Sequence, residues 1–292
     1  MRIVVLGDLH FYQLAIWPWQ LFSKRLLGQA NLWLNRRRHF KPSLWPSVRD
    51  QVLARAPDAL LCSGDFTTTA LPREFRTART AWADLVETLG PSLGSFVVPG
   101  NHDRYTYASA RKRLFEGAFE PWTSQEKWPA RWMLGDQTQL IGLDPTRPNR
   151  FNASGKLGDA QLSKLRVCLD EVPAGHRILI LCHYPIGTPE ELPDEAPGHG
   201  LQDSEALIDT LAESERAITY LHGHIHWPWK WTPPNAPNVT ALNAGAPMLT
   251  GSQYPQGQGF LEIEIPDDDG EIRYSRQVLD GEGEAGWKST PP

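Results

Sequence analysis

The chain has 292 residues and a formal net charge of −5, and 40% of its residues are hydrophobic and 22% charged. This composition is that of an ordinary soluble globular protein and excludes a protein that binds polyanions through bulk charge. The three cysteines do not make a disulfide framework, and no apolar run approaches the roughly 18 residues of a membrane span. The apolar run at the N-terminus is too short for a signal peptide. We therefore expect a cytoplasmic protein.

The first part of the chain alternates predicted strands and predicted helices. Short apolar runs bounded by turn residues predict strands, and apolar residues at three- and four-residue steps predict helices. The expected strands lie at residues 3–6, 58–62, 96–98, 138–143, 177–182 and 217–221. The expected helices lie at residues 19–38, 47–55, 72–89, 107–115, 158–172 and 204–213.

The last part of the chain contains predicted strands only. They lie at residues 227–232, 239–243, 260–265 and 272–278 and are joined by turns rich in Pro, Gly and Asn. Alternating strands and helices, followed by strands alone, predict a single layered α/β domain over residues 1–280. The polar, Gly-rich stretch at 281–292 predicts a flexible C-terminal tail.

Polar side chains of a restricted kind follow the predicted strands. If those strands run parallel in one sheet, their carboxyl ends converge on one crevice. Carboxylate, imidazole and amide oxygen ligands suit Zn, Mn, Fe or similar divalent ions. The side chains at these positions are Asp8, His10, Asp65, Asn101, His102, Asp103, His183, His224 and His226.

The spacing of these residues favours a site for two metal ions. Two cations roughly 3.5–4 Å apart can activate a water and stabilise both the attacking and the leaving oxygen of an in-line displacement. A ligand shared by two cations must be anionic, and Asp65 is the natural choice. In Asp8-Leu9-His10 and His224-Ile225-His226, alternate residues of an extended segment face the same side.

The ordered set of residues resembles the calcineurin-like metallophosphoesterases. The family pattern is Asp-x-His, Gly-Asp, Gly-Asn-His-Asp/Glu, a further His, and Gly-His-x-His. The matching residues here run in that order from Asp8 to His226, which is most of the chain. The resemblance implies a two-sheet β-sandwich flanked by α-helices, in α-β-β-α layers. It also implies two divalent metal ions, such as Mn, Fe or Zn.

The resemblance further implies a role for each matching residue. One metal would be held by Asp8, His10, Asp65 and His226, and the other by Asp65, Asn101, His183 and His224. His102 would act near the leaving oxygen as a general acid or transition-state stabiliser, and Asp103 would hydrogen-bond it and fix its tautomer. The implied reaction is attack of a hydroxide, bound to both metals, on a phosphodiester or phosphomonoester.

The substrate is less closely defined by the sequence. Gly64-Asp65-Phe66-Thr67-Thr68 departs from the Gly-Asp-x-Val-Asp-Arg-Gly of protein phosphatases, and Thr68 replaces an Asp that is usual in bacterial cyclic-nucleotide phosphodiesterases. The overall layout nevertheless resembles the bacterial phosphodiesterase-like branch. We expect a small phosphoester substrate and no specific nucleic-acid partner. Candidate substrate contacts are Arg147, Asn149 and Trp227, with loop decoration or core packing as alternative roles.

An insertion at about residues 14–45 is basic and rich in Trp. From Leu9 to Arg49 the chain has seven Lys and Arg and no Asp or Glu. Three interpretations are open: a packed helix with solvated charges, a lid whose cations attract phosphate, or peripheral membrane contact through residues 17–41. A membrane-peripheral hydrolase of a lipid or nucleotide pyrophosphate is accordingly one alternative function. A non-catalytic scaffold with this fold is another, although the presence of His102 favours an enzyme.

Overall fold

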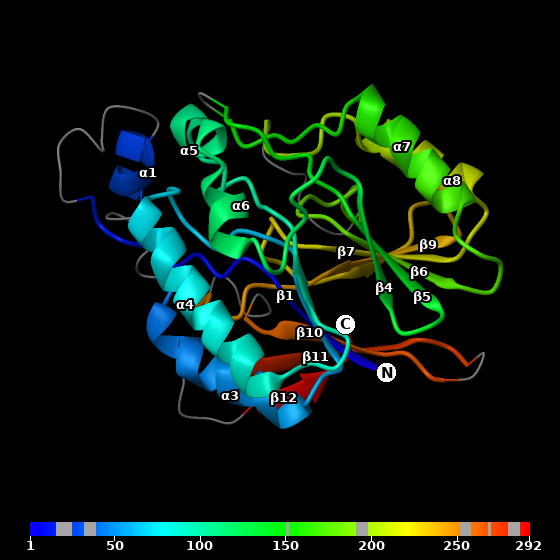
Figure 1. The fold of residues 1–292 in the computed structure, drawn as a ribbon, viewed down its shortest axis with the longest axis horizontal. Helices are drawn as coiled ribbons and strands as arrows, with labels where there is room; N and C mark the ends of the chain where they lie inside the picture. Colours follow the sequence, from blue (N-terminus) through cyan, green and yellow to red (C-terminus); the bar gives the residue numbers. More distant parts are fainter. Residues whose placement is uncertain are drawn as a thin grey trace.

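Two mixed sheets of six strands each form the centre of the fold (Figure 1). The structure, a computed structural model, describes residues 1–15, 25–31, 39–149, 152–190, 198–251, 258–267, 270–279 and 287–292. The first sheet has the order β12 (Trp287–Thr290), β11 (Arg273–Leu279), β10 (Phe260–Glu264), β1 (Arg2–Leu6), β2 (Ala59–Cys62) and β3 (Ser95–Val97). The second has the order β4 (Ala130–Leu134), β5 (Thr138–Gly142), β6 (Arg177–Leu181), β7 (Ile218–His222), β9 (Val239–Asn243) and β8 (Lys230–Trp231).

Each sheet has a parallel part. In the first sheet β1, β2 and β3 run parallel, and in the second sheet β5, β6, β7 and β9 do so. All other pairings are antiparallel. The loops that leave the carboxyl ends of the parallel strands therefore gather at one edge of each sheet, where α/β proteins build their ligand sites.

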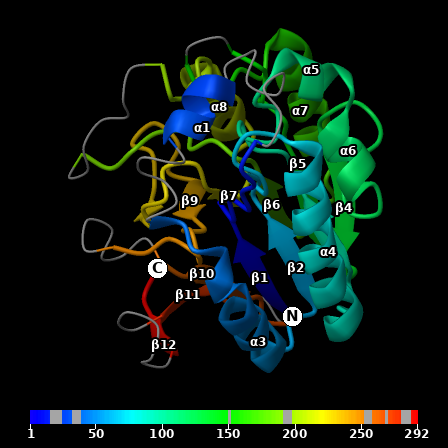
Figure 2. The ribbon, with the colours of Figure 1, turned by 90° about the vertical axis from the view of Figure 1, so that its left-hand side faces the viewer.

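Helices cover the outer face of each sheet (Figures 1 and 2). The apolar side chains of α3, α4 and α6 pack on the first sheet, and those of α7 and α8 pack on the second. The helices are α1 (Arg25–Asn31), the 3-10 turn η3 (Pro42–Leu44), α3 (Trp45–Arg55), α4 (Pro72–Leu89), α5 (Tyr107–Arg111), α6 (Leu114–Phe119), α7 (Asp159–Asp170) and α8 (Ser204–Glu213).

Alternation of side chains along the strands divides the core into layers. In β1, Val4 and Leu6 pack against α3 and α4, whereas Ile3 and Val5 pack against the second sheet. Strand β6 has the same alternation between the helix layer and the layer between the sheets. Both sheets are thus buried on two faces, and the expected α-β-β-α arrangement is confirmed.

The expected strands of the alternating part correspond to β1, β2, β3, β5, β6 and β7, with ends that differ by one residue. Two strands were not expected. The first, β4, is an edge strand whose middle residues are exposed or half-buried, so it lacks a clear apolar alternation, although Gly135-Asp136 before β5 is a hairpin signal. The second, β12, pairs with β11 over residues 287–290, where the polar composition predicts a flexible tail.

The helices differ from expectation at two places. The helix expected at 107–115 is divided into α5 and α6 by Arg113, whose φ of 49° lies in the left-handed region. Of the helix expected at 19–38, the structure describes only α1, because residues 16–24 and 32–38 lie outside the described residues. Most of the insertion, including Trp17, Trp19 and Trp33, is therefore not placed. Among the helices that are described, none combines the length and apolar character needed to cross a membrane.

Candidate metal centre

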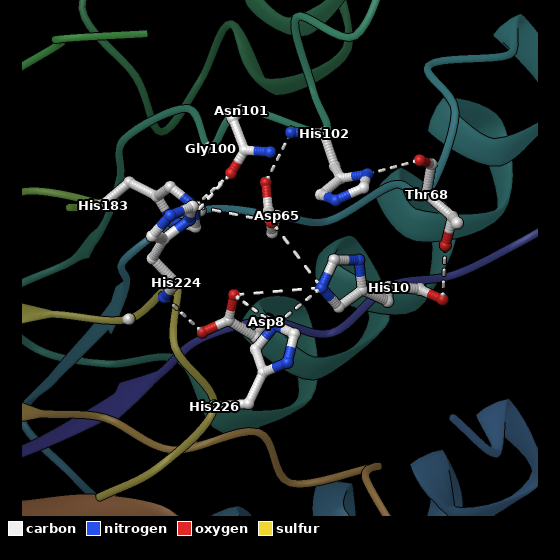
Figure 3. Close-up of polar contacts among 12 residues, drawn as sticks. Asp8, His10, Asp65, Thr68, Gly100, Asn101, His102, His183, His224 and His226 are labelled. Carbon is white, nitrogen blue, oxygen red and sulfur yellow. Dashed lines mark hydrogen bonds and ion pairs between the residues drawn. The ribbon is translucent and has the colours of Figure 1, made fainter. Parts of the chain in front are cut away.

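Five loops deliver the polar side chains that were singled out in the sequence (Figure 3). Each loop follows a parallel strand, three of them in the first sheet and two in the second. Asp8 and His10 follow β1, Asp65 follows β2, Asn101, His102 and Asp103 follow β3, His183 follows β6, and His224 and His226 follow β7. The site therefore forms where the carboxyl ends of the two sheets meet.

The backbone at several of these residues is in the left-handed region. The φ values are 51° at Asp8, 48° at His10, 58° at Asp65, 76° at His224 and 62° at His226. A residue other than Gly in this conformation costs about 1–3 kcal/mol. Loop hydrogen bonds maintain it, for example from the Asp8 amide to the Gly64 carbonyl at 3.0 Å. Such a concentration of strained residues is typical of functional sites.

The first group of donor atoms comprises Asp8, His10 and His226. Nε2 of His226 lies 3.1 Å from Nε2 of His10 and 3.3 Å from Oδ1 of Asp8. Nε2 of His10 lies 3.9 Å from the same Asp8 oxygen. The three ligand atoms lie within 4.8 Å of one another and could hold a metal ion.

The second group comprises Asn101, His183 and His224, with Asp65 beside it. Oδ1 of Asn101 lies 2.9 Å from Nε2 of His183 and 2.9 Å from Nδ1 of His224. Oδ2 of Asp65 lies 3.4 Å from Nε2 of His183 and 3.6 Å from Nε2 of His10. One oxygen of Asp65 is therefore near donors of both groups.

The orientation of the imidazoles fits a bound cation. Nδ1 of His183 donates to the Ser63 carbonyl at 2.9 Å, and Nε2 of His224 donates to the His199 carbonyl at 2.9 Å. Each ring then directs its other nitrogen toward the Asn101 oxygen, which is an acceptor. Two acceptors can face one another only with a proton or a cation between them, so these nitrogens could bind a metal ion in place of a proton. Oδ1 of Asp8 is also buried without a hydrogen-bond partner, which is the state of an oxygen that could bind a cation.

Two glycines allow the carboxylates to sit this close to the backbone. A Cβ at Gly100 would overlap Oδ1 of Asp65, and a Cβ at Gly223 would overlap Oδ2 of Asp8. Both glycines belong to the sequence patterns that precede Asn101 and His224. Because Gly has no side chain, the backbone at these two positions can lie close to the two carboxylates.

The charges of the second group are strongly coupled. Burial opposes charge on Asp65, yet the imidazoles of His183, His102 and His10 hold the pKa of its carboxyl well below the ordinary range. Burial lowers the pKa of His183, but the Asp65 carboxylate outweighs it and raises that pKa to about 9. Burial, and then the charge of His183, hold the pKa of His224 well below its usual value. A cation bound here would displace the His183 proton, as metals do at imidazole ligands.

His102 lies beside both groups and is oriented by a backbone carbonyl. Its Nδ1 donates to the Thr68 carbonyl at 2.6 Å, and its amide donates to Oδ1 of Asp65 at 2.8 Å. Its ring meets the His10 ring edge-on at a centroid distance of 4.9 Å and stacks on Tyr105 at 5.3 Å. With Nδ1 bonded in this way, the His102 ring is held in position beside the donor groups (Figure 3).

Asp103 does not have the contact that was expected of it. Its carboxylate accepts hydrogen bonds from the amides of Gly100 at 3.0 Å, Thr67 at 2.9 Å and Phe66 at 3.3 Å. Burial, followed by the charge of Asp65, raises the pKa of Asp103 to about 7. Asp103 therefore joins the loop after β2 to the loop after β3, and the carbonyl of Thr68 takes the expected role of orienting His102.

A family comparison agrees with this geometry. Residues 1–228 match the model of the calcineurin-like phosphoesterases. The chain belongs to this family. The donor cluster described above could hold metal ions.

Two bacterial proteins are similar to the chain in sequence. A probable cyclic nucleotide phosphodiesterase of Synechococcus is 30% identical over 175 residues, which are 59% of this chain and 59% of that protein. A second probable cyclic nucleotide phosphodiesterase, from Pseudoalteromonas, is 24% identical over 193 residues, which are 66% of this chain and 63% of that protein. The match thus spans about three fifths of the length of these curated relatives.

Solved structures show the same phosphoesterase fold. A dimetal phosphatase from Danio rerio superposes with a TM-score of 0.56 at 16% identity, and the match covers 99% of this chain and 98% of that one. A sulfate thiohydrolase from Thermus thermophilus superposes with a TM-score of 0.50 at 16% identity, covering 94% of this chain and 56% of that one.

The three candidate substrate contacts lie outside the donor groups. The side-chain nitrogen of Asn149 donates to the Ser154 carbonyl at 2.8 Å, which stabilises its own loop. Nε of Arg147 is buried without a hydrogen-bond partner, and Trp227 is half-buried directly after His226. Substrate binding by these residues remains a prediction.

Sequence reasoning overlooked contacts made by the backbone. His199 has an exposed side chain, but its carbonyl orients His224. The Thr68 carbonyl orients His102 in the same way. Carbonyl contacts leave no mark on residue type, so the sequence held no signal for them.

Proposed function

We propose that this phosphoesterase uses two divalent metal ions to hydrolyse a phosphodiester. The observation that carries the proposal is the position of Asp65, whose Oδ2 lies 3.6 Å from Nε2 of His10 and 3.4 Å from Nε2 of His183. A single buried carboxylate can thus serve both donor groups. The metal ions, when bound by these groups, would supply an activated water and neutralise charge on the phosphoryl oxygens.

The chain's own part in the reaction centres on His102. Its Nδ1 proton is bound by the Thr68 carbonyl, so the ring, when protonated on both nitrogens, presents its Nε2 proton to the oxygen that leaves phosphorus. The hydrogen bond from its amide to Asp65 fixes the backbone of His102 relative to the donor groups. Such a preset position is what general acid catalysis requires, because the proton must be transferred over hydrogen-bond distance.

A phosphodiester is preferred to other esters because of the named relatives. Both curated relatives are probable cyclic nucleotide phosphodiesterases, so a cyclic nucleotide is the first natural candidate. Thr68, which replaces the usual Asp of that branch, uses its hydroxyl to donate to the His10 carbonyl at 3.2 Å. The Thr68 side chain thus stabilises the backbone at His10. The presence of Thr in place of Asp at this position is therefore compatible with a phosphodiester substrate.

The test combines metal analysis with a substrate panel. Purified protein is stripped with a chelator, reloaded with Mn²⁺, Fe²⁺ or Zn²⁺, and assayed for bound metal by elemental analysis. The panel comprises bis-p-nitrophenyl phosphate, p-nitrophenyl phosphate, 3′,5′-cyclic AMP and a lipid pyrophosphate in vesicles. We expect two ions per chain and faster turnover of the diesters. Absence of turnover on the whole panel by metal-loaded protein would refute the proposal, and activity confined to vesicles would favour the membrane alternative.

A further inference from the structure

Helix α1, which lies within the basic insertion, is bonded to the loop between β2 and α4. Arg25, the first residue of the helix, donates from Nε to the Thr69 carbonyl at 2.9 Å and from Nη2 to the Ala70 carbonyl at 2.7 Å. Gln29, one turn later, donates to the Thr69 hydroxyl at 3.0 Å. The helix, which lies near the beginning of α4 in Figure 1, thus binds consecutive residues of this loop.

The same loop orients His102. The carbonyl of Thr68, directly before the two carbonyls bound by Arg25, accepts from Nδ1 of His102 at 2.6 Å. From the other side, the Glu74 carboxylate accepts from the Thr69 and Leu71 amides at 2.9 and 3.0 Å. Between these two charged side chains Ala70 is held at a φ of 53°. A non-Gly residue in that conformation persists only when its surroundings impose it.

Helix α1 also touches the residue on which His102 stacks. Gly28 lies against Tyr105, where a Cβ would come within 2.6 Å of the hydroxyl oxygen and 2.9 Å of the ring. The Tyr105 ring stacks on the His102 ring with an interplanar angle of 14°. The helix therefore reaches His102 by two separate routes, one through a backbone carbonyl and one through an aromatic ring.

We propose that helix α1 is a positioning element for His102, acting through Arg25 on the Thr68 carbonyl and through Gly28 on the Tyr105 ring. The inference rests on the proposed phosphoesterase function, and it gives the basic insertion a role in catalysis. Displacement of a catalytic group by about 1 Å lowers the rate by as much as roughly 100-fold. In this proposal Arg25 and Gly28 make no contact with the substrate. Their replacement changes the rate by changing the position of His102.

The experiment uses two test variants and two matched controls in the full-length, metal-loaded protein. Arg25→Gln is paired with Arg216→Gln, because Arg216 likewise donates to backbone carbonyls, those of Val172 at 2.9 Å and Pro173 at 3.0 Å, away from the site. Gly28→Ala is paired with Gly117→Ala, because a Cβ at Gly117, also helical, meets no atom within 4 Å. Two test sites keep the inference testable if one variant fails to fold.

We expect each test variant to lose roughly 10- to 100-fold in kcat with unchanged metal content and KM, and each control to stay within about twofold. The loss should be larger for an alkyl than for a p-nitrophenyl leaving group, because only the poor leaving group needs a proton. In a His102→Ala background, Arg25→Gln should cause no further loss, since the two residues act through one interaction. An equal loss in both backgrounds would overturn the inference and leave the proposed function intact.

A spectroscopic readout separates the inference from the proposed function. In the neutral form of the His102 ring, nitrogen NMR should show the proton on Nδ1 in the unaltered protein and in Arg216→Gln, and a mixture of tautomers in Arg25→Gln and Gly28→Ala. If the protein turned over no substrate, the proposed function would be refuted. The NMR comparison would still test whether helix α1 positions the His102 ring. Identical ring signals in all four variants would overturn it.

Discussion

Asp65 is the residue on which the two donor groups converge. Its Oδ2 lies near a nitrogen of His10 and of His183, while its Oδ1 accepts the His102 amide at 2.8 Å. Gly100 leaves room for this carboxylate, since any side chain there would overlap it. Asp65 thus connects both candidate metal positions to His102, the candidate acid. Its replacement should therefore affect both metal binding and catalysis.

We predict that Asp65→Asn loses most of the bound metal. The amide keeps the shape of the side chain but removes the negative charge that offsets the repulsion between two cations. Elemental analysis should show a fall from two ions per chain to one or none. Asp84→Asn, which changes an exposed carboxylate paired with Arg49, is the matched control and should keep both ions. Two tightly held ions in Asp65→Asn would show that the bridging role is wrong.

His102→Ala should have the opposite pattern, with activity lost and metal retained. General acid catalysis contributes roughly 10²–10⁴-fold, so we expect kcat to fall within that range for substrates with poor leaving groups. His176→Ala is the control, because His176 precedes β6 and lies at the opposite end of that strand from His183. Unchanged kcat in His102→Ala, measured with an alkyl phosphodiester, would exclude the acid role.

At the scale of elements, the loop between β2 and α4 organises the site. Asp103 holds its first residues through the Phe66 and Thr67 amides, and Arg25 and Glu74 hold its last residues. Glu74 stands in the first turn of α4, where a carboxylate also interacts favourably with the helix dipole. The loop is therefore fixed by α4, which directly follows it, and by two segments distant from it in the chain, α1 and the loop after β3.

The buried Glu74 should make stability depend on pH. Burial raises the pKa of Glu74 above its ordinary value of 4.5, although hydrogen bonds from Leu71 and Thr69 oppose the shift. The protonated form is thus favoured in the folded state. Relative to Glu74→Gln, which cannot titrate, the wild type should gain stability as pH falls through the folded-state pKa, with the full gain below 4.5.

Urea unfolding of both proteins at a series of pH values measures this difference. Each unit by which the pKa is raised corresponds to about 1.4 kcal/mol of unfolding free energy. Taking the difference between the two proteins removes the contribution of every other titrating group that they share. A difference that stays constant with pH, or that shrinks as pH falls, would contradict the prediction.

At the scale of the whole molecule, the site joins the two sheets. Asp8, His10 and Asp65 come from the first sheet, and His183 and His226 come from the second. Away from the site, apolar side chains such as Val5 and Leu181 pack between the sheets without direction, beside a hydrogen bond between the hydroxyls of Thr219 and Tyr274 at 2.9 Å. Metal ions held by donors of both sheets would therefore cross-link them at this end of the sandwich.

Removal of metal should accordingly lower the thermal stability of the whole fold. A ligand that binds only the folded state stabilises it by about 2.7 kcal/mol at 100 times its Kd. We expect Tm to fall on treatment with a chelator and to recover on reloading. The fall should be much smaller in Asp65→Asn, which serves as the internal control. Equal Tm values for stripped and loaded wild type would argue against ligands drawn from both sheets.

Sequence patterns alone predict the strands that precede each candidate donor, the α/β layering and the candidate donors themselves. These features depend on local apolar patterns and on short stretches such as Asp8-Leu9-His10, which require particular residue types. Only the tertiary structure decided that Thr68 rather than Asp103 orients His102, that β12 completes the first sheet, and that Arg25 reaches the loop after β2. Those contacts use backbone groups, which every residue carries, between segments distant in the chain. They leave no pattern in the order of side chains, and only the folded arrangement selects them.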